Sequence, residues 1–264
     1  MTATAAAAAV TATAVLAACG TAQPPPARGA KTPSASGRVL RPDPPATPLP
    51  VASNPRPVDC RRTRCVALTF DAGPGPYTDR LLDILKAKGI NATFFLLGKN
   101  GVNRFPELVR RQAAEGHELA NHTWTHRRLT EASPTEIRRQ LVPVQERVKE
   151  LTGRTPTLMR PPQGLTNPRV AEVCRSLGLA QILWTVTAKD YRDHDPKVIT
   201  KRVLQGARRN GIILLHDVYP GTVPAVPGII DGLRQRGLTP VTVSQLFAPH
   251  RPQPGRAYWS APST

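Results

Sequence analysis

The chain has 264 residues, 40% of them hydrophobic, which is enough for one sizeable domain with appendages. Its formal net charge is +18, and Lys and Arg are spread along the whole chain. This is typical of a solvated surface, or of a protein that binds an anionic membrane or a phosphate-bearing cell wall. No nucleic-acid-binding module is recognisable and only 5% of residues are aromatic, so we do not expect nucleic acid as a partner.

Residues 1–19 are rich in Ala, Thr and Val and end in Leu-Ala-Ala-Cys19. The stretch is too short and too weakly apolar to span a bilayer, and it predicts an export signal. Its end is similar to a bacterial lipoprotein cleavage box, so we expect lipid anchoring at Cys19 to the outer face of the cell membrane, or otherwise secretion. No Lys or Arg precedes the apolar stretch, which leaves open an atypical signal or a misplaced start.

Residues 20–57 are dense in Pro, with Ala, Ser, Thr and Arg. Such a composition cannot bury enough apolar surface to fold, so the segment predicts a disordered tether or simply a disordered terminus. We expect a catalytic domain at 58–248 and a tail without an assigned role at 249–264.

Cys60 and Cys65 are five residues apart. In an exported protein this favours a small disulfide loop, which would pin the start of the first strand. Cys174 falls in a predicted helix, and we expect a buried, inert thiol there.

From residue 65 onward, apolar runs alternate with helix-like segments. The expected strands are 65–70, 92–97, 117–120, 156–159, 180–186, 211–216 and 239–243. The expected helices are 78–88, 105–115, 134–151, 168–177, 195–208 and 224–236. Ser133, Pro134 and Glu136 form a helix-start signature, and Pro143 is expected to kink or split that helix. The alternation predicts an α/β fold with a parallel sheet, and the strand number favours a distorted, incomplete seven-stranded barrel.

Asp71 directly follows the first apolar strand, and a Gly-Pro-Gly-Pro run then breaks the chain. In barrels of alternating strands and helices, side chains at this end of a strand face the active site. His122 and His126 follow the third strand at i and i+4, a spacing that predicts one face of a helical turn, where two imidazoles could bind one metal ion. Such a pair alternatively caps, packs or faces solvent.

Arg160 begins the rigid turn Arg-Pro-Pro-Gln-Gly after the fourth strand. Near Asp71 it would stabilise the ionised carboxylate that a general base requires; the alternative is a surface arginine on a structural turn. His216 ends the sixth strand and is a candidate general acid, or else a satisfied histidine. Asp190 could hydrogen-bond His216 and raise its pKa, and Tyr191 could line an apolar slot.

Five motifs occur in series: Thr-Phe-Asp, His-Thr-x-x-His, Arg-Pro-Pro-x-Gly, a Trp-containing strand followed by Asp, and Leu-Leu-His. Over roughly residues 58–248 this series resembles the polysaccharide deacetylase (NodB-homology) family, carbohydrate esterase family four. The resemblance implies a distorted seven-stranded (β/α) barrel that uses a divalent metal. It also implies removal of acetyl groups from N-acetylglucosamine-type polymers or from xylan.

The resemblance also implies roles for single residues. By the matching positions, Asp71 is the general base, Arg160 orients it, and His216 is the general acid. His122 and His126 are the metal ligands. Leu214 and Tyr191 line the acetyl-methyl pocket, and the backbone N–H of Gln163 is the oxyanion donor.

Four positions depart from the family pattern. Ala72 stands where the family usually has an Asp metal ligand, which favours a weakly held metal such as Zn or Co, or a metal-free site. Thr187 stands where an Asp usually tunes the acid, with Asp190 as the nearest substitute. Tyr191 replaces Trp, and Gln163 replaces Tyr.

The leading hypothesis is therefore a monomeric, exported deacetylase of peptidoglycan or a related cell-envelope glycan. The rival is a catalytically degenerate protein that only binds cell-wall glycan. A third possibility, a polyanion binder, depends on charge alone.

Overall fold

The computed structural model describes residues 58–262. The expected export signal with Cys19 and the expected tether at 20–57 lie outside the described residues. Among residues 58–262, no helix combines the length and apolar character needed to cross a membrane.

The described residues form one sheet in which every strand pairs in parallel. The strands are β1 (Cys65–Asp71), β2 (Thr93–Leu96), β3 (Glu118–Asn121), β4 (Leu158–Met159), β5 (Ala180–Ile182), β6 (Val186–Thr187), β7 (Ile212–His216), β8 (Thr239–Val241) and β9 (Ala257–Tyr258). Their order is β6-β7-β1-β2-β3-β4-β5-β9, and β8 pairs with the first residues of β1.

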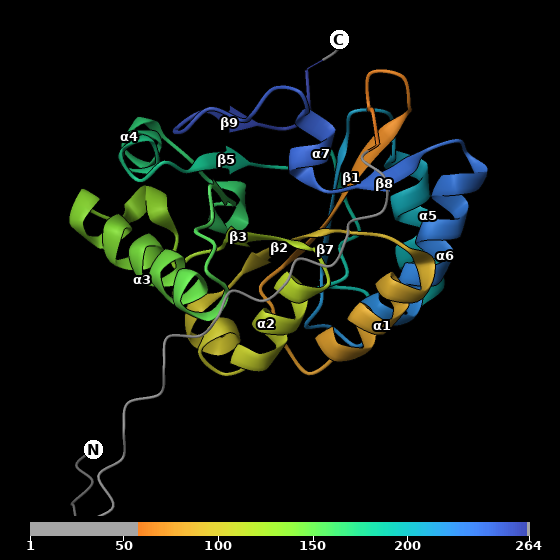
Figure 1. Ribbon diagram of the computed structural model, residues 1–264, viewed down its shortest axis with the longest axis horizontal. Helices are drawn as coiled ribbons and strands as arrows, with labels where there is room; N and C mark the ends of the chain where they lie inside the picture. The colour runs from red at the N-terminus through yellow and green to blue at the C-terminus, as the bar shows by residue number, and fades with distance from the viewer. Residues whose placement is uncertain (1–57, 263–264) are drawn as a thin grey trace, which may run out of the picture. The chain divides into compact units, whose positions relative to one another are not determined.

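Helices alternate with these strands and lie around the outside of the curled sheet (Figure 1). The α-helices are α1 (Thr78–Lys88), α2 (Pro106–Ala114), α3 (Pro134–Thr152), α4 (Pro168–Ser176), α5 (Pro196–Gly206), α6 (Thr222–Gln235) and α7 (Val243–Phe247). Three short helical turns are η1 (Gly98–Val102), η2 (Leu129–Glu131) and η3 (Pro162–Gly164). The prediction of an α/β fold with a distorted, incomplete barrel is confirmed, although the described residues form nine strands where seven were expected.

The prediction of a single strand at 180–186 is wrong. The chain forms β5 and β6 instead, because residues 183–185 change hydrogen-bonding partners: Leu183 N–H donates to Tyr258, and Thr185 N–H donates to Ile212. β6 and β9 are the two ends of the strand order, so the barrel is open between these two strands.

The interior of the barrel is set by the alternation of side chains along β1 and β7. Val66, Leu68 and Phe70 join the large core cluster under the helices, whereas Ala67 packs in a separate cluster. Asp71, an even number of residues beyond Ala67, therefore points to the inner side at the end of the strand.

Helix α3 begins as expected, with the Ser133 hydroxyl accepting a hydrogen bond from Glu136 N–H. The helix runs unsplit through Pro143. Its buried face, which includes Ile137, Leu141 and Val148, packs on both sides of the proline, and this tertiary packing outweighs the lost backbone hydrogen bond.

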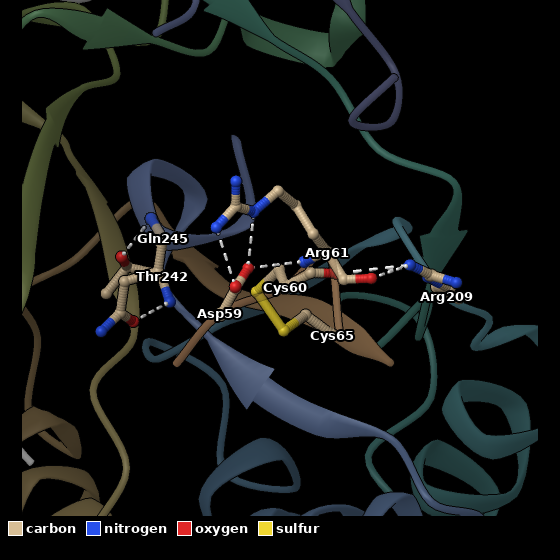
Figure 2. The surroundings of a disulfide bond; sticks show 7 residues. All are labelled: Asp59, Cys60, Arg61, Cys65, Arg209, Thr242 and Gln245. Atoms are coloured by element: carbon tan, nitrogen blue, oxygen red, sulfur yellow. Dashed lines mark hydrogen bonds and ion pairs between the residues drawn. A yellow bond between two sulfur atoms is a disulfide. The ribbon is translucent and has the colours of Figure 1, made fainter. Parts of the chain in front are cut away.

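The predicted disulfide between Cys60 and Cys65 is confirmed, with Cα atoms 5.4 Å apart. Figure 2 shows that the Arg209 guanidinium reaches this loop, where it donates to the carbonyls of Cys60 and Arg61. The loop thus fixes the start of β1. Cys174 is buried as expected, and burial raises the pKa of its thiol to about 12.

The segment at 249–262 was expected to be a tail outside the catalytic domain. It contributes β9 to the sheet instead. Gln181 N–H donates to Arg256, and Ala261 N–H donates to Asn210. The segment therefore covers the free edge of β5.

Candidate active site

A cavity of about 570 Å³ opens at the carboxyl ends of the central strands. It is lined by Asp71, Ala72, Leu97, His122, His126, Pro161, Gln163, Trp184, Thr187, Tyr191, Leu214, His216 and Tyr219. Seven of the nine residues singled out from the sequence are in this lining. The other two, Arg160 and Asp190, are fully buried and hydrogen-bonded to lining residues.

Asp71 and His216 are neighbours because β1 and β7 pair in a register that sets these two residues opposite each other. Each is the last residue of its strand, after an apolar run that buries the rest of the strand. Parallel pairing thus brings a carboxylate and an imidazole to the same edge of the sheet.

Arg160 holds the Asp71 carboxylate from inside the barrel. Its Nη1 lies 2.6 Å from Asp71 Oδ1, and the same nitrogen donates to the Thr69 hydroxyl at 2.8 Å. Nε donates to the carbonyl of Ile182 at 2.9 Å, and Nη2 donates to that of Leu183 at 3.1 Å. The guanidinium therefore has one fixed orientation. Since Arg160 is fully buried, the alternative hypothesis of a surface arginine is wrong.

The cost of burying this guanidinium is offset by its partners. Besides the carboxylate, the Phe95 ring lies 4.0 Å from the guanidinium carbon and the Trp184 ring lies 5.8 Å away. Burial lowers the pKa of Arg160, while the Asp71 charge and hydrogen bond act against this shift.

His122 is buried beside Asp71, with its Nδ1 2.8 Å from the carbonyl of Arg160. A carbonyl accepts only, so Nδ1 carries the proton and Nε2 presents its lone pair. Nε2 lies 3.8 Å from Asp71 Oδ2. Burial lowers the pKa of His122 to about 4, and the Asp71 charge only partly opposes this, so the imidazole is neutral at pH 7.

His126 meets His122 with ring centroids 4.9 Å apart. The predicted helical turn is wrong: residues 122–128 form a loop in which Thr123 and His126 have φ of 70° and 62°. Asn121 and Gln140 hold this loop by accepting hydrogen bonds from the backbone N–H groups of residues 123 and 125. Burial lowers the pKa of His126, against the attraction of Asp71.

The two imidazoles fit a divalent metal as nitrogen ligands. The 3.8 Å between His122 Nε2 and Asp71 Oδ2 is within twice a Zn–ligand bond of about 2.1 Å. However, across residues 58–262 no three His, Cys, Asp or Glu side chains are grouped in an arrangement that could hold a metal ion. Ala72, which also lines the cavity, supplies no donor atom.

His216 is held by Asp190, as predicted. Its Nδ1 lies 2.8 Å from Asp190 Oδ1, and its backbone N–H donates to Oδ2 at 2.7 Å. The Thr222 hydroxyl donates to the same Oδ2 at 2.7 Å. Burial alone would lower the pKa of His216, but the hydrogen bond and charge of Asp190 outweigh it and raise the pKa.

The same contacts lower the pKa of Asp190, although its burial acts in the opposite direction. Asp190 therefore stays ionised while His216 gains and loses its proton. Thr187, three residues earlier, lines the cavity and accepts a hydrogen bond from Lys189 N–H.

An apolar wall faces the two polar groups. Leu214 and Trp184 line the cavity, and Tyr191 sets its ring edge-to-face against His216 with centroids 6.0 Å apart. Tyr191 is 52% exposed, so it stands at the rim. Gln163 has φ of 59°, and its side-chain oxygen accepts a hydrogen bond from Arg128 at 3.0 Å, outside the Arg160 turn.

Sequence reasoning missed Tyr219 and Thr222. The Tyr219 ring packs against His216 with centroids 5.4 Å apart and lines the cavity. Its position three residues after a candidate catalytic histidine was the available signal. Nothing in the sequence linked Thr222 to Asp190, because 32 residues separate them and the hydrogen bond forms only in the fold.

Asp217, next to His216, is fully buried and does not line the cavity. It accepts a hydrogen bond from the Thr78 hydroxyl, and burial raises its pKa to about 6. A Cβ on Gly73 would overlap its carboxylate, so only glycine allows the loop after Asp71 to pass here. Asp217 thus supports the loop that follows Asp71.

The sequence of the chain is similar to those of known polysaccharide deacetylases. A family model described as polysaccharide deacetylase matches residues 59–182. A peptidoglycan-N-acetylglucosamine deacetylase of Listeria monocytogenes is 37% identical over 195 residues, which are 74% of this chain and 41% of the relative. The chain therefore spans about two fifths of that relative's length. A chitooligosaccharide deacetylase of Bradyrhizobium is 36% identical over 195 residues, or 68% of this chain and 89% of the relative.

Solved structures show the same likeness. A structure described as T48 deacetylase with substrate has a TM-score of 0.73 and 39% identity, covering 76% of this chain and 99% of that chain. A mutant of a carbohydrate esterase family 4 pseudoenzyme has a TM-score of 0.67 and 28% identity, covering 70% of this chain and 68% of that chain.

Proposed function

Because this chain belongs to the polysaccharide deacetylase family, we propose that it hydrolyses acetyl groups from an N-acetylated cell-envelope glycan, such as peptidoglycan. One observation carries the proposal. A carboxylate held by a buried guanidinium and an imidazole held by a buried carboxylate stand opposite each other at the edge of one cavity.

The proposed reaction assigns the proton movements to these two groups. Asp71 accepts a proton from a water molecule as the water oxygen bonds to the acetyl carbonyl carbon. His216, whose protonated form is favoured by Asp190, donates its proton to the amide nitrogen as the carbon–nitrogen bond breaks. The products are acetate and a free amino sugar. Arg160 and Asp190 orient the two groups without touching the substrate.

The remaining lining residues would position the acetyl group. Leu214 and Trp184 offer apolar surface for its methyl group, and Tyr191 closes the rim. The backbone N–H of Gln163, in the turn that follows Arg160, is the proposed donor to the oxyanion. A single preorganised donor of this kind contributes roughly 3–4 kcal/mol in acyl transfer.

His122 and His126 would hold a divalent metal, with Zn as the proposed ion. When bound, such an ion acidifies water and polarises a carbonyl oxygen. We expect Ala72→Asp to tighten Zn binding by about tenfold or more, since carboxylate oxygen is a third ligand type that Zn accepts. Competition with a fluorescent chelator measures this, and an unchanged affinity in the variant would place position 72 outside the metal site.

The function is tested by acetate release from N-acetylglucosamine oligomers and from peptidoglycan. Purified protein is assayed after chelation and after addition of Zn or Co. We expect release that chelation reduces and metal restores. No acetate from either substrate under any of these conditions would reject the deacetylase.

A second candidate is a degenerate protein that binds glycan without hydrolysing it. Ala72 at the usual ligand position motivates it, and a pseudoenzyme is among the similar structures. It predicts glycan binding with no acetate release, and binding that is indifferent to His126→Ala.

The proposed place of action is the cell envelope, outside the cytoplasm. Support comes from relatives named as peptidoglycan deacetylases and from the export-like sequence at residues 1–19. Lipid attachment at Cys19 is part of this proposal. Mass spectrometry of the mature N-terminus from a bacterial host tests it, because an unmodified Cys19 would reject the anchor.

A further inference from the structure

A second groove, of about 360 Å³, lies between α7 and the C-terminal segment. Its lining includes Phe247, His250, Arg251, Arg256 and Tyr258, and no residue is shared with the active-site cavity. A neighbouring pocket that shares Phe247 and His250 with it also contains Cys60. The groove therefore borders the loop before β1, whereas Asp71 is the last residue of that strand.

The groove is cationic. Its lining contains no Asp or Glu, and the sequence from 249 to 264 contains none either. Within residues 58–262, neither Arg251 nor Arg256 forms a salt bridge, and both are exposed. Two acidic side chains on adjoining segments are already paired: Asp59 with Arg61, and Glu172 with Arg175.

The groove is also partly aromatic, and its tyrosine is fixed by several contacts. The Tyr258 ring packs edge-to-face on Phe247 with centroids 5.2 Å apart, and its hydroxyl accepts a hydrogen bond from Gln253 N–H at 3.0 Å. The guanidinium carbon of Arg256 lies 5.3 Å from the centre of the same ring. The cation is thus held over an aromatic face, and Arg251 contributes a second guanidinium to the lining of the same groove.

We propose that this groove binds a phosphodiester-linked polymer of the cell envelope, with Arg251 and Arg256 on successive phosphates and Tyr258 against the carbon chain between them. Guanidinium groups match the geometry of phosphate oxygens with two parallel N–H groups, and they remain charged at any physiological pH. The chain's net charge of +18 favours the same partner. Binding at this end of the barrel leaves the catalytic rim free for the N-acetylated glycan. Only the envelope location is taken from the proposed function.

The test is equilibrium binding of the full chain to poly(glycerol phosphate) at several salt concentrations. The double variant Arg251→Gln, Arg256→Gln is compared with the control Arg80→Gln, Arg154→Gln, which loses the same charge at exposed positions elsewhere. For the groove variant we expect affinity to fall about tenfold. The slope of log K against log salt should become shallower by about 1.4, or 0.7 for each phosphate that the variant no longer neutralises. The control should retain the wild-type slope to within half that change.

Three outcomes would overturn the proposal: equal losses in the two double variants, equally tight binding of polyglutamate, or the same arginine dependence toward phosphatidylglycerol vesicles. The last would assign the groove to a membrane surface. Acetate release from soluble N-acetylglucosamine oligomers is measured on the same samples and should not change. A protein that binds the polymer but releases no acetate would reject the deacetylase and leave this proposal standing.

Discussion

The two halves of the candidate site hold a charge in opposite ways. In the base half, a buried guanidinium fixes a carboxylate: Arg160 donates to Asp71 and also to a hydroxyl and two backbone carbonyls. In the acid half, a buried carboxylate fixes an imidazole: Asp190 accepts from the ring and backbone of His216 and from the Thr222 hydroxyl. The supporting residues, Arg160 and Asp190, are fully buried. Asp71 and His216, which have the proposed proton-transfer roles, line the cavity.

The two halves should therefore respond differently to mutation and to pH. Arg160 is charged at every accessible pH. The base half therefore depends on the packing around the guanidinium, and disturbing it should lower the stability of the fold. The pKa of His216 is raised by Asp190, so the acid half carries the pH dependence on its alkaline side. Changes in the base half should therefore alter folding and rate together, whereas changes in the acid half should alter the pH profile.

The largest effect is expected from Asp71→Asn. The amide keeps the shape of the side chain but cannot accept the proton, so kcat/KM for acetate release should fall by about 10²–10⁴-fold. Asp231→Asn, which removes a surface carboxylate paired with Lys88, is the matched control and should retain activity. A loss smaller than tenfold in Asp71→Asn would remove this residue from the base role.

The next effect is expected from Arg160→Leu. It leaves the Asp71 carboxylate buried without its counter-charge, which should cost about 3–5 kcal/mol of unfolding free energy. Urea denaturation measures this. Arg110→Leu breaks the exposed pair with Glu107 and should cost no more than about 1 kcal/mol. Equal losses in the two variants would show that the base half is no more stabilising than a surface pair.

A smaller effect, of a different kind, is expected from Asp190→Asn. Asp190 raises the pKa of His216, so its neutral isostere should lower that pKa and move the alkaline limb of the kcat/KM profile to lower pH. The rate on that limb should fall by about tenfold, a part of the contribution of general acid catalysis. An alkaline limb that stays in place would contradict the assignment of His216 as the acid.

The smallest effect is expected from Thr222→Val, which removes one of the donors to Asp190. The loss of one hydrogen bond, worth about 1 kcal/mol, should reduce kcat/KM severalfold because Asp190 is held less firmly. Since the Thr222 hydroxyl lowers the pKa of Asp190, its removal should move the alkaline limb slightly to higher pH, opposite to Asp190→Asn. Thr200→Val, at a hydroxyl bonded only to backbone carbonyls on α5 and α6, is the control. A shift of equal size in the control would show that the effect is structural.

Much of the site could be predicted because strand ends are visible in the sequence. Asp71 and His216 each follow a buried apolar run, and a polar residue at that point lies at the rim of any parallel sheet. The motif series then indicated how these residues work together. The hydrogen bond between Asp190 and His216 could also be anticipated, since both residues follow adjacent strand-like runs.

Other features could not be predicted because they depend on partners distant in the chain. The loop that carries His126 is held by Gln140 and by backbone groups near Gly98, and these contacts outweigh the helical spacing of the two histidines. Residues 180–186 have the pattern of one strand but divide, since each half pairs with a different neighbour. The contribution of β9 was hidden because two residues give no periodic signal.

By itself the sequence determined which chemical groups stand at strand ends, since burial and side-chain alternation are properties of short segments. Only the tertiary structure decided that Arg160 points inward to Asp71, 89 residues away, with further donors on the carbonyls of Ile182, the last residue of β5, and Leu183. A guanidinium can be buried only where a carboxylate and several acceptors converge, and that convergence exists only after the sheet has curled.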